Sequence, residues 1–277
     1  KSHIMSNVCL LVDFILTMLF TKVMLMSSYN FNDNTLLHTC GFNFYSFVNI
    51  MKNGIMSSSM AKEKGIDLNR NFDGSNLDDT ISCVRYLYVN DEIEDGAYNL
   101  HIKHGISFII EDVDYIYDKS DRVIHRYDEV LVKDYIDISK IKGILIPESY
   151  FDCSLNELEY IRRSSTSYVL VKNNLNKLIS FINLLGGNSS IKEYDDYLRE
   201  LYLINEAFRS EKDELEMKSL KDDFVDVIDE INYYLGNEMN ECFKKILGDN
   251  VCLYDVVNYF NKDLPIYFLD DSNVKRK

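Results

Sequence analysis

The hydrophobic periodicity of this sequence changes at Gly186-Gly187, and that change limits the folds open to the chain. Before the two glycines, short apolar runs alternate with polar links, which is typical of strands and short helices. After Ile191, apolar residues recur at three- and four-residue spacing until Gly236, which predicts a long amphipathic helix that ends there. The pattern therefore predicts an α+β core followed by a C-terminal helical subdomain.

Chain length limits the number of domains, and net charge limits the kind of partner. The chain has 277 residues, of which 46% are hydrophobic, so it can build one large domain or two. We predict an N-terminal helix over residues 5–30, a core over 31–187 and a helical subdomain over 188–277. The formal net charge of -15 disfavours a nucleic-acid partner, because the phosphate backbone would be repelled.

The most apolar run extends from Val8 to Met26. A membrane span or a signal sequence would have this character, but Asp13 and Lys22 interrupt the run and no basic region precedes it. We therefore predict no membrane span, and a helix that is buried or covered by a partner. The alternative is a Met-rich docking surface for another protein.

The cysteines are scattered along the sequence. They are Cys9, Cys40, Cys83, Cys153, Cys242 and Cys252. None forms a C-x-x-C motif or a Cys/His cluster, so the sequence indicates neither a zinc site nor a disulfide framework. We expect no metal and a reducing, cytoplasmic compartment.

The remaining patterns predict individual elements. Strands are expected at Leu36–Cys40, Thr80–Val89, Gly105–Glu111, Val130–Val132, Ile144–Ile146 and Ser167–Val171. Helices are expected at Asn43–Asn53, Leu155–Arg163 and Leu175–Leu185, with a short helix or turn at Asp112–Tyr117.

Four positions are candidates for chemistry. Asp128 and Glu129 precede the apolar run Val130–Val132, and strand alternation turns them to opposite faces. We select Glu129 as the residue that enters a cleft; a solvated acidic strand end is the alternative. His38 ends a strand that faces a helix start, which suits an anion or a structural role equally. Arg85, inside an apolar strand, requires a carboxylate or phosphate partner.

Three segments resemble successive core elements of the ADP-ribosyltransferase superfamily. They are LHTCGFNFYSFVNIMKNGIMS, ISCVRYLYV and DEVLVKDYIDISKIKGILIP. The family pattern has a strand bearing His or Arg before a helix that ends in Gly-Ile. It continues with a middle strand bearing Ser or Tyr and often Arg, and a late strand introduced by the catalytic Glu. The likeness covers about Leu36 to Leu185 and implies a split mixed β-sheet core.

The resemblance also implies roles for single residues. His38 would bind the adenosine ribose of NAD, with Thr39 beside it. Ser82 and Arg85 would line the nicotinamide and phosphate side. Glu129 would hydrogen-bond the ribose next to nicotinamide and stabilise the positive charge that develops there.

The sequence departs from the Arg-specific subgroup at Tyr127, which stands two residues before Glu129, where that subgroup has a second Glu. We expect a mono-ADP-ribosyltransferase with NAD as cofactor and a protein as acceptor. It would act in the cytoplasm, or as a toxin or effector secreted into a host cytoplasm. The alternatives are an NAD glycohydrolase with the same pocket, or a non-catalytic protein that binds a partner through its terminal helices.

Overall fold

The computed structural model describes residues 29, 31–32, 34–66, 79–85, 88–89, 92–93, 105–117, 129–163, 167–261 and 263–269. The helix expected over residues 5–30 lies outside the described residues except for Tyr29, and Asp128 also lies outside them. Among the residues that are described, no helix combines the length and the apolar character needed to cross a bilayer.

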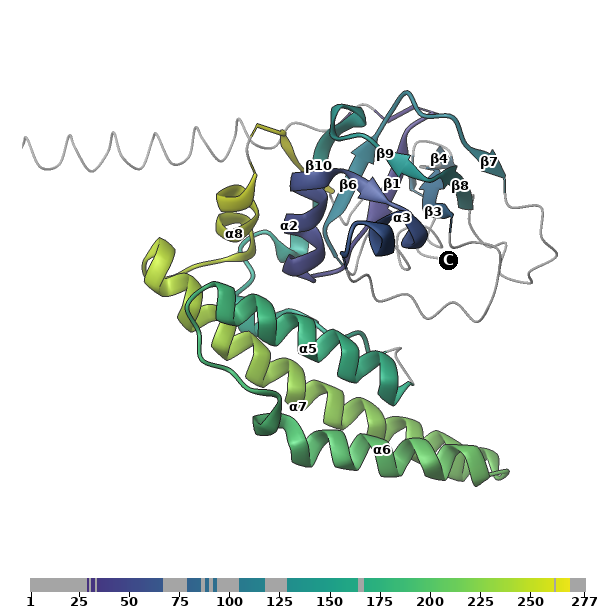
Figure 1. Ribbon diagram of the computed structural model, residues 1–277, viewed down its shortest axis with the longest axis vertical. Helices are drawn as coiled ribbons and strands as arrows, with labels where there is room; N and C mark the ends of the chain where they lie inside the picture. Colours follow the sequence, from purple (N-terminus) through teal and green to yellow (C-terminus); the bar gives the residue numbers. More distant parts are fainter. Residues whose placement is uncertain are drawn as a thin grey trace, which may run out of the picture.

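A seven-stranded mixed sheet joins strands from the first part of the chain with one strand from near its end, in the order β11-β10-β6-β1-β3-β8-β7 (Figure 1). The strands are β1 (Leu36–Thr39), β3 (Thr80–Arg85), β6 (Ser107–Ile110), β7 (Ile116–Tyr117), β8 (Glu129–Lys133), β10 (Ile141–Pro147) and β11 (Ile266–Leu269). Every neighbouring pair is antiparallel except β10 and β11, which are parallel. The predicted α+β class is therefore confirmed.

Short strands flank the main sheet. β2 (Ile55–Met56) pairs with β9 (Tyr135–Ile136), and β4 (Tyr88–Val89) pairs with β5 (Glu92–Ile93). Single turns of 3-10 helix, η2 (Ile138–Lys140), η3 (Glu148–Tyr150), η4 (Leu155–Glu157) and η5 (Ile191–Tyr194), connect the larger elements.

Helix α2 (Phe44–Asn53) covers one face of the sheet. It begins where the side chain of Asn43 accepts a hydrogen bond from the backbone N–H of Ser46, and it ends at Gly54, whose φ is 75°. Phe47 from this helix stacks on Phe108 of β6, with ring centroids 5.6 Å apart. The predicted helix and its glycine stop are confirmed. A short helix, α3 (Ser58–Glu63), follows.

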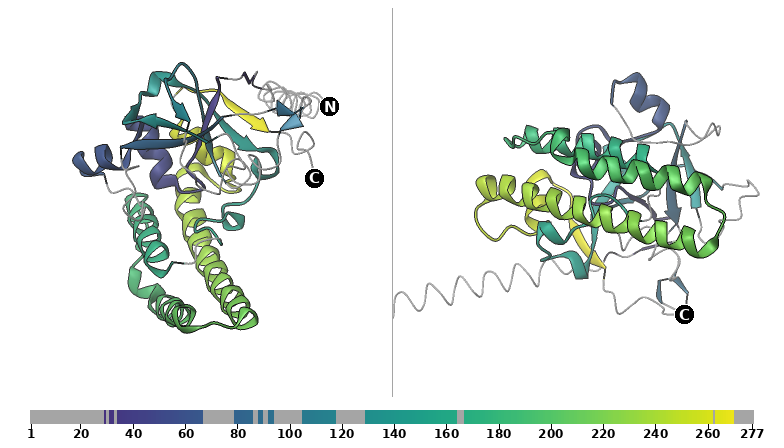
Figure 2. Two further views of the ribbon diagram at one scale, coloured as in Figure 1. Left: turned by 90° about the vertical axis from the view of Figure 1, so that its right-hand side faces the viewer. Right: turned by 90° about the horizontal axis from the view of Figure 1, so that it is seen from below.

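Four helices follow residue 167 in the described part of the chain: α5 (Tyr168–Leu184), α6 (Asp195–Ser210), α7 (Glu214–Leu247) and α8 (Leu253–Phe260). Figures 1 and 2 show α6 and α7 as an antiparallel pair that extends away from the sheet, with α5 lying between this pair and α2. The length of α7, 34 residues, makes it the longest described element.

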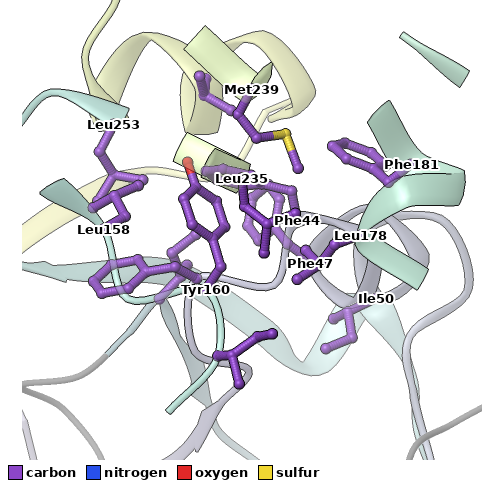
Figure 3. Packing of buried hydrophobic residues seen from close by; sticks show 14 of the residues in the cluster. Phe44, Phe47, Ile50, Leu158, Tyr160, Leu178, Phe181, Leu235, Met239 and Leu253 are labelled. Atoms are coloured by element: carbon purple, nitrogen blue, oxygen red, sulfur yellow. The ribbon is translucent and has the colours of Figure 1, made fainter. Parts of the chain in front are cut away.

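The hydrophobic core is continuous from the sheet into the helices (Figure 3). The ring of Phe44 on α2 contacts the rings of Tyr160, of Phe181 on α5 and of Phe243 on α7. A separate small cluster, which contains Leu37 of β1, lies on the opposite face of the sheet. The proposed boundary between residues 187 and 188 stays a prediction, and buried side chains from both sides of it share one core.

Several predicted elements are wrong in detail. Ser167–Val171, expected as a strand, includes the first turn of α5, because Val171 is buried on the same helical face as Leu175. Leu155–Arg163, expected as a helix, forms only η4 and then an irregular segment. Gly236, expected as a helix end, lies inside α7, which ends at Gly248 with φ 98°.

Two further differences concern strands. Arg85 ends β3, so the strand predicted over Thr80–Val89 is divided, and its last two residues form β4. After β6 the chain turns at Asp112, whose φ is 58°, so of the two alternatives expected for Asp112–Tyr117 the turn is present, but the last two residues form β7. The edge strand β11 was not predicted.

Candidate functional site

A cavity of about 290 Å³ lies where the end of β1 meets α2 and α5. One face of α2 supplies a polar wall, because residues three or four positions apart project from the same side of a helix. The polar residues of this wall are Asn43, Ser46, Asn49 and Asn53. His38 and Thr39 line the cavity from β1, and Asn174 and Lys177 line it from α5.

The lining has the opposite charge balance to the chain. Asp and Glu make up 45 of the 277 residues, yet among the described residues that line the cavity none is acidic. Two of the lining residues, Arg162 and Lys177, are cationic. Lys177 is 9% exposed, which is unusual for a lysine. The local charge therefore favours an anionic ligand.

His38 has a fixed orientation. Its Nδ1 lies 2.9 Å from the backbone carbonyl oxygen of Ser82 on β3. A carbonyl oxygen only accepts hydrogen bonds, so Nδ1 carries the proton and donates it. The sheet thus brings together two of the predicted site residues, and Ser82 acts through its backbone.

Thr39 is the next residue along β1. Its hydroxyl lies 2.6 Å from the hydroxyl of Ser107, which is fully buried on β6. This short hydrogen bond fixes the Thr39 side chain at the edge of the cavity. Thr39 therefore has a structural partner as well as a place in the lining.

Arg85 and Glu129 occupy other positions in the sheet. Arg85 is half-buried on β3, pairs with Leu36, and is not among the described residues that line the cavity. Glu129 begins β8, and its side chain lies outside the described part of the structure. The backbone row that contains Glu129 continues through Val84 to Leu37, the residue before His38.

The thiol of Cys40 lies at the same end of β1. Burial raises its pKa to about 12, and the nearby Arg162 guanidinium acts in the opposite direction. The thiol is therefore protonated at neutral pH and is a poor nucleophile. All five cysteines in the described part of the chain are free: Cys40, Cys83, Cys153, Cys242 and Cys252.

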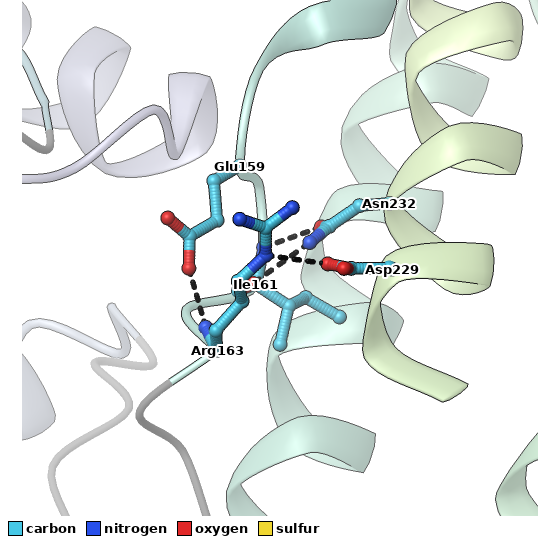
Figure 4. A network of polar contacts seen from close by, with 5 residues as sticks. All are labelled: Glu159, Ile161, Arg163, Asp229 and Asn232. Atoms are coloured by element: carbon cyan, nitrogen blue, oxygen red, sulfur yellow. Dashed lines mark hydrogen bonds and ion pairs between the residues drawn. The ribbon is translucent and has the colours of Figure 1, made fainter. Parts of the chain in front are cut away.

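The segment that carries Arg162 is attached to α7 (Figure 4). The backbone N–H of Ile161 donates to Asn232 Oδ1 at 2.8 Å, and Asn232 Nδ2 donates to the Ile161 carbonyl at 2.9 Å. Arg163 Nε donates to Asp229 Oδ1 at 2.7 Å, and the backbone N–H of Arg163 donates to the Glu159 carboxylate. Both neighbours of Arg162 are thus held in place.

Sequence reasoning did not find Arg162, Lys177 or the polar wall of α2. A polar helix face normally faces solvent, so the asparagines of α2 carried no signal of a cavity. Lys177 did offer one, because it interrupts an apolar pattern between Leu175 and Leu178, which are fully buried. These residues come together only in the folded chain, where α5 and the segment that carries Arg162 both meet α2 at the cavity.

The fold and the cavity define an α+β protein with a mixed sheet and a small polar site suited to an anion. No protein-family model, no curated protein and no solved structure matches this chain.

Proposed function

We propose that this chain is a mono-ADP-ribosyltransferase that binds NAD at the cavity and transfers ADP-ribose to a protein. One observation carries the proposal: His38 and Thr39 line a cavity whose described lining residues include no acidic side chain, in a chain with a net charge of -15. These are two of the positions that the resemblance assigns to NAD. The pyrophosphate of NAD is negatively charged, so a cavity wall with cationic and no acidic described residues favours its binding in an otherwise acidic chain.

The cavity size fits part of NAD. A volume of about 290 Å³ is at the lower end of the range for ligand pockets, roughly 300–1,000 Å³. In this proposal the adenosine half and the phosphates occupy the cavity, and the nicotinamide ribose extends across β3 towards the start of β8. Glu129, to which the resemblance assigns the contact with that ribose, begins β8.

The reaction breaks the bond between the ribose carbon and the nicotinamide nitrogen. Nicotinamide leaves as a neutral molecule, the acceptor nucleophile bonds to the ribose carbon, and the acceptor's proton passes to solvent. Positive charge develops on the sugar in the transition state, so a fixed carboxylate accelerates this step by electrostatic stabilisation. The role belongs to Glu129 in this scheme.

A partner-binding function is the second candidate, and the α6–α7 pair is the observation that favours it. Large apolar side chains are exposed there, including Leu203 at 59%, Leu215 at 81% and Tyr233 at 60%. Exposed apolar surface of this kind often marks a protein interface. In a transferase the same surface would serve to dock the acceptor protein.

The experiment is incubation of the purified chain with labelled NAD and a cell lysate. Label on protein is the expected result. Free ADP-ribose with no labelled protein would instead identify an NAD glycohydrolase. Intact NAD after prolonged incubation, together with no effect of NAD on the melting temperature, would reject both activities and leave the partner-binding function.

A further inference from the structure

We infer that Arg162 and Lys177 form an anion-binding subsite that holds a phosphate or pyrophosphate group, and that Asn232 of α7 positions Arg162 in it. The inference deepens the proposed function and rests on it only for the identity of the whole ligand. The subsite is distinct from the residues that the resemblance assigns to NAD, among which Arg85 was expected to contact the phosphates.

Lys177 gives the first argument. Its helix, α5, buries Leu175, Leu178 and Ile179 in the core, and Lys177 itself is 9% exposed. Lys177 also lines the cavity. A buried cation at a cavity wall is suited to an anion inside the cavity.

Arg162 reaches the same cavity from a different element. It lines the cavity together with Cys40, the residue that follows β1. Asn43, which begins α2, also lines this region. Two cations from separate elements and the start of a helix thus converge, and among the described lining residues no carboxylate competes with a ligand.

The chemistry of the pair favours phosphate. A guanidinium makes two parallel hydrogen bonds to phosphate oxygens, and an ammonium adds a point charge with three donors. A pyrophosphate presents oxygens to both groups at once. An uncharged nucleoside would leave both cations without a charged ligand.

Asn232 acts on Arg162 through the backbone. Its carboxamide exchanges two hydrogen bonds with Ile161, and Asp229 binds the side chain of Arg163. On either side of Arg162, Ile161 is therefore attached to α7 through its backbone and Arg163 through its side chain (Figure 4). A cation held in this way loses less conformational freedom when the anion binds. Asn232 is a positioning residue for the subsite.

Titration calorimetry with ADP, pyrophosphate and adenosine tests the subsite. We expect ADP and pyrophosphate to bind the wild-type chain and adenosine to bind at least tenfold more weakly than ADP. Arg162→Gln and Lys177→Met should each weaken ADP binding at least tenfold. Lys172→Gln, which removes an exposed cation from the same helix, is the matched control and should leave the affinity unchanged.

Asn232→Ala tests the positioning. We expect it to weaken ADP binding in the wild-type background but to add nothing when Arg162→Gln is already present. A purely structural role would weaken binding equally in both backgrounds, and that outcome would reject the positioning role. All variants are compared at a temperature at which circular dichroism shows them folded.

The outcomes separate this inference from the proposed function. If Arg162→Gln and Lys177→Met bind ADP like the wild type, or if adenosine binds as tightly as ADP, there is no subsite. Should Lys177→Met fail to fold, Arg162→Gln decides alone, because Arg162 is exposed. ADP binding that depends on Arg162 in a chain that never consumes NAD would retain the subsite and reject the transferase.

Discussion

Glu129 is the residue on which the proposed chemistry depends most directly. Glu129→Gln keeps the size of the side chain and removes its charge, so NAD should still bind while turnover falls on the order of 10²–10³. NAD consumption and protein labelling, with the melting temperature as a check on folding, measure the effect. Asp128→Asn is the matched control and should be nearly silent. Equal activity in wild type and Glu129→Gln would end the assignment.

The cysteine thiols predict how stability responds to alkaline pH. Burial raises the thiol pKa from 9.0 to about 12 in Cys40 and to about 11 in Cys252. Between pH 9 and 11 the unfolded chain therefore loses thiol protons that the folded chain retains. Because the unfolded state then binds fewer protons, stability is complete below pH 9 and falls as the pH rises above it.

Melting temperatures at pH 8 and pH 10.5 measure this response, and the value at pH 10.5 should be lower. Cys40→Ala should reduce the difference between the two temperatures, since it removes one group that contributes to it. An unchanged melting temperature across this range would contradict the assignment of buried, protonated thiols.

At the scale of the element, α7 depends on a glycine at its middle. A Cβ atom on Gly236 would lie 2.6 Å from the Cα of Asn156 and 3.1 Å from the carbonyl oxygen of Leu155. Glycine to alanine within a helix usually gains about 1 kcal/mol. Here we expect Gly236→Ala to lower the melting temperature, because α7 must move away from η4.

Scanning calorimetry measures the effect of Gly236→Ala. Ser219→Ala, at an exposed position of the same helix, is the control and should leave the melting temperature unchanged or slightly raised. A higher melting temperature for Gly236→Ala would mean that the close approach of η4 and α7 does not restrict this position.

The same glycine shows why some elements were predicted and others were not. Strands such as β6 and β10 are short apolar runs, and α2 has a cap, a periodic face and a glycine stop, so local sequence specifies them. Gly236 has the local signal of a helix end, but tertiary contact with η4 decides its role. Val169 and Val171 favour a strand locally, and burial of Val171 within α5 overrides that preference.

The residues of the candidate site also divide into those that local sequence identifies and those that only the folded structure identifies. His38 was found because it ends a strand before a helix, which is a local pattern, and Thr39 was named only through the family resemblance. Arg162 and Lys177 belong to elements that meet this strand only in the folded chain, and each is one of 30 lysines and arginines in the sequence. Packing of α5 against α2 places Lys177 at the cavity, and attachment of the segment after η4 to α7 holds the residues on both sides of Arg162.

For the whole molecule, the continuous core predicts that the helices after residue 187 are required for folding. Buried side chains of α7, among them Leu235, Met239 and Phe243, belong to the same cluster as Phe44 and Phe181. A chain that ends at residue 187 would expose these two rings. We expect it to lack a cooperative thermal transition and to bind a hydrophobic dye.

Circular dichroism and dye fluorescence on the shortened chain are the measurements. A cooperative melt with no dye binding would show instead that residues 31–187 form an independent domain, as the change in periodicity at Gly186-Gly187 predicts. The full-length chain, measured in parallel, provides the reference for cooperativity.

The parallel pairing of β10 with β11 sets an order of events during protein synthesis. Ile144 pairs with Ile266, so the partner of β10 is made long after β10 itself. Pairings between distant parts of a chain form slowly, and an open strand edge readily accepts another extended chain. Until residues 266–269 have left the ribosome, the nascent protein therefore carries an uncovered edge at β10, and this is the interval in which a chaperone would be most needed.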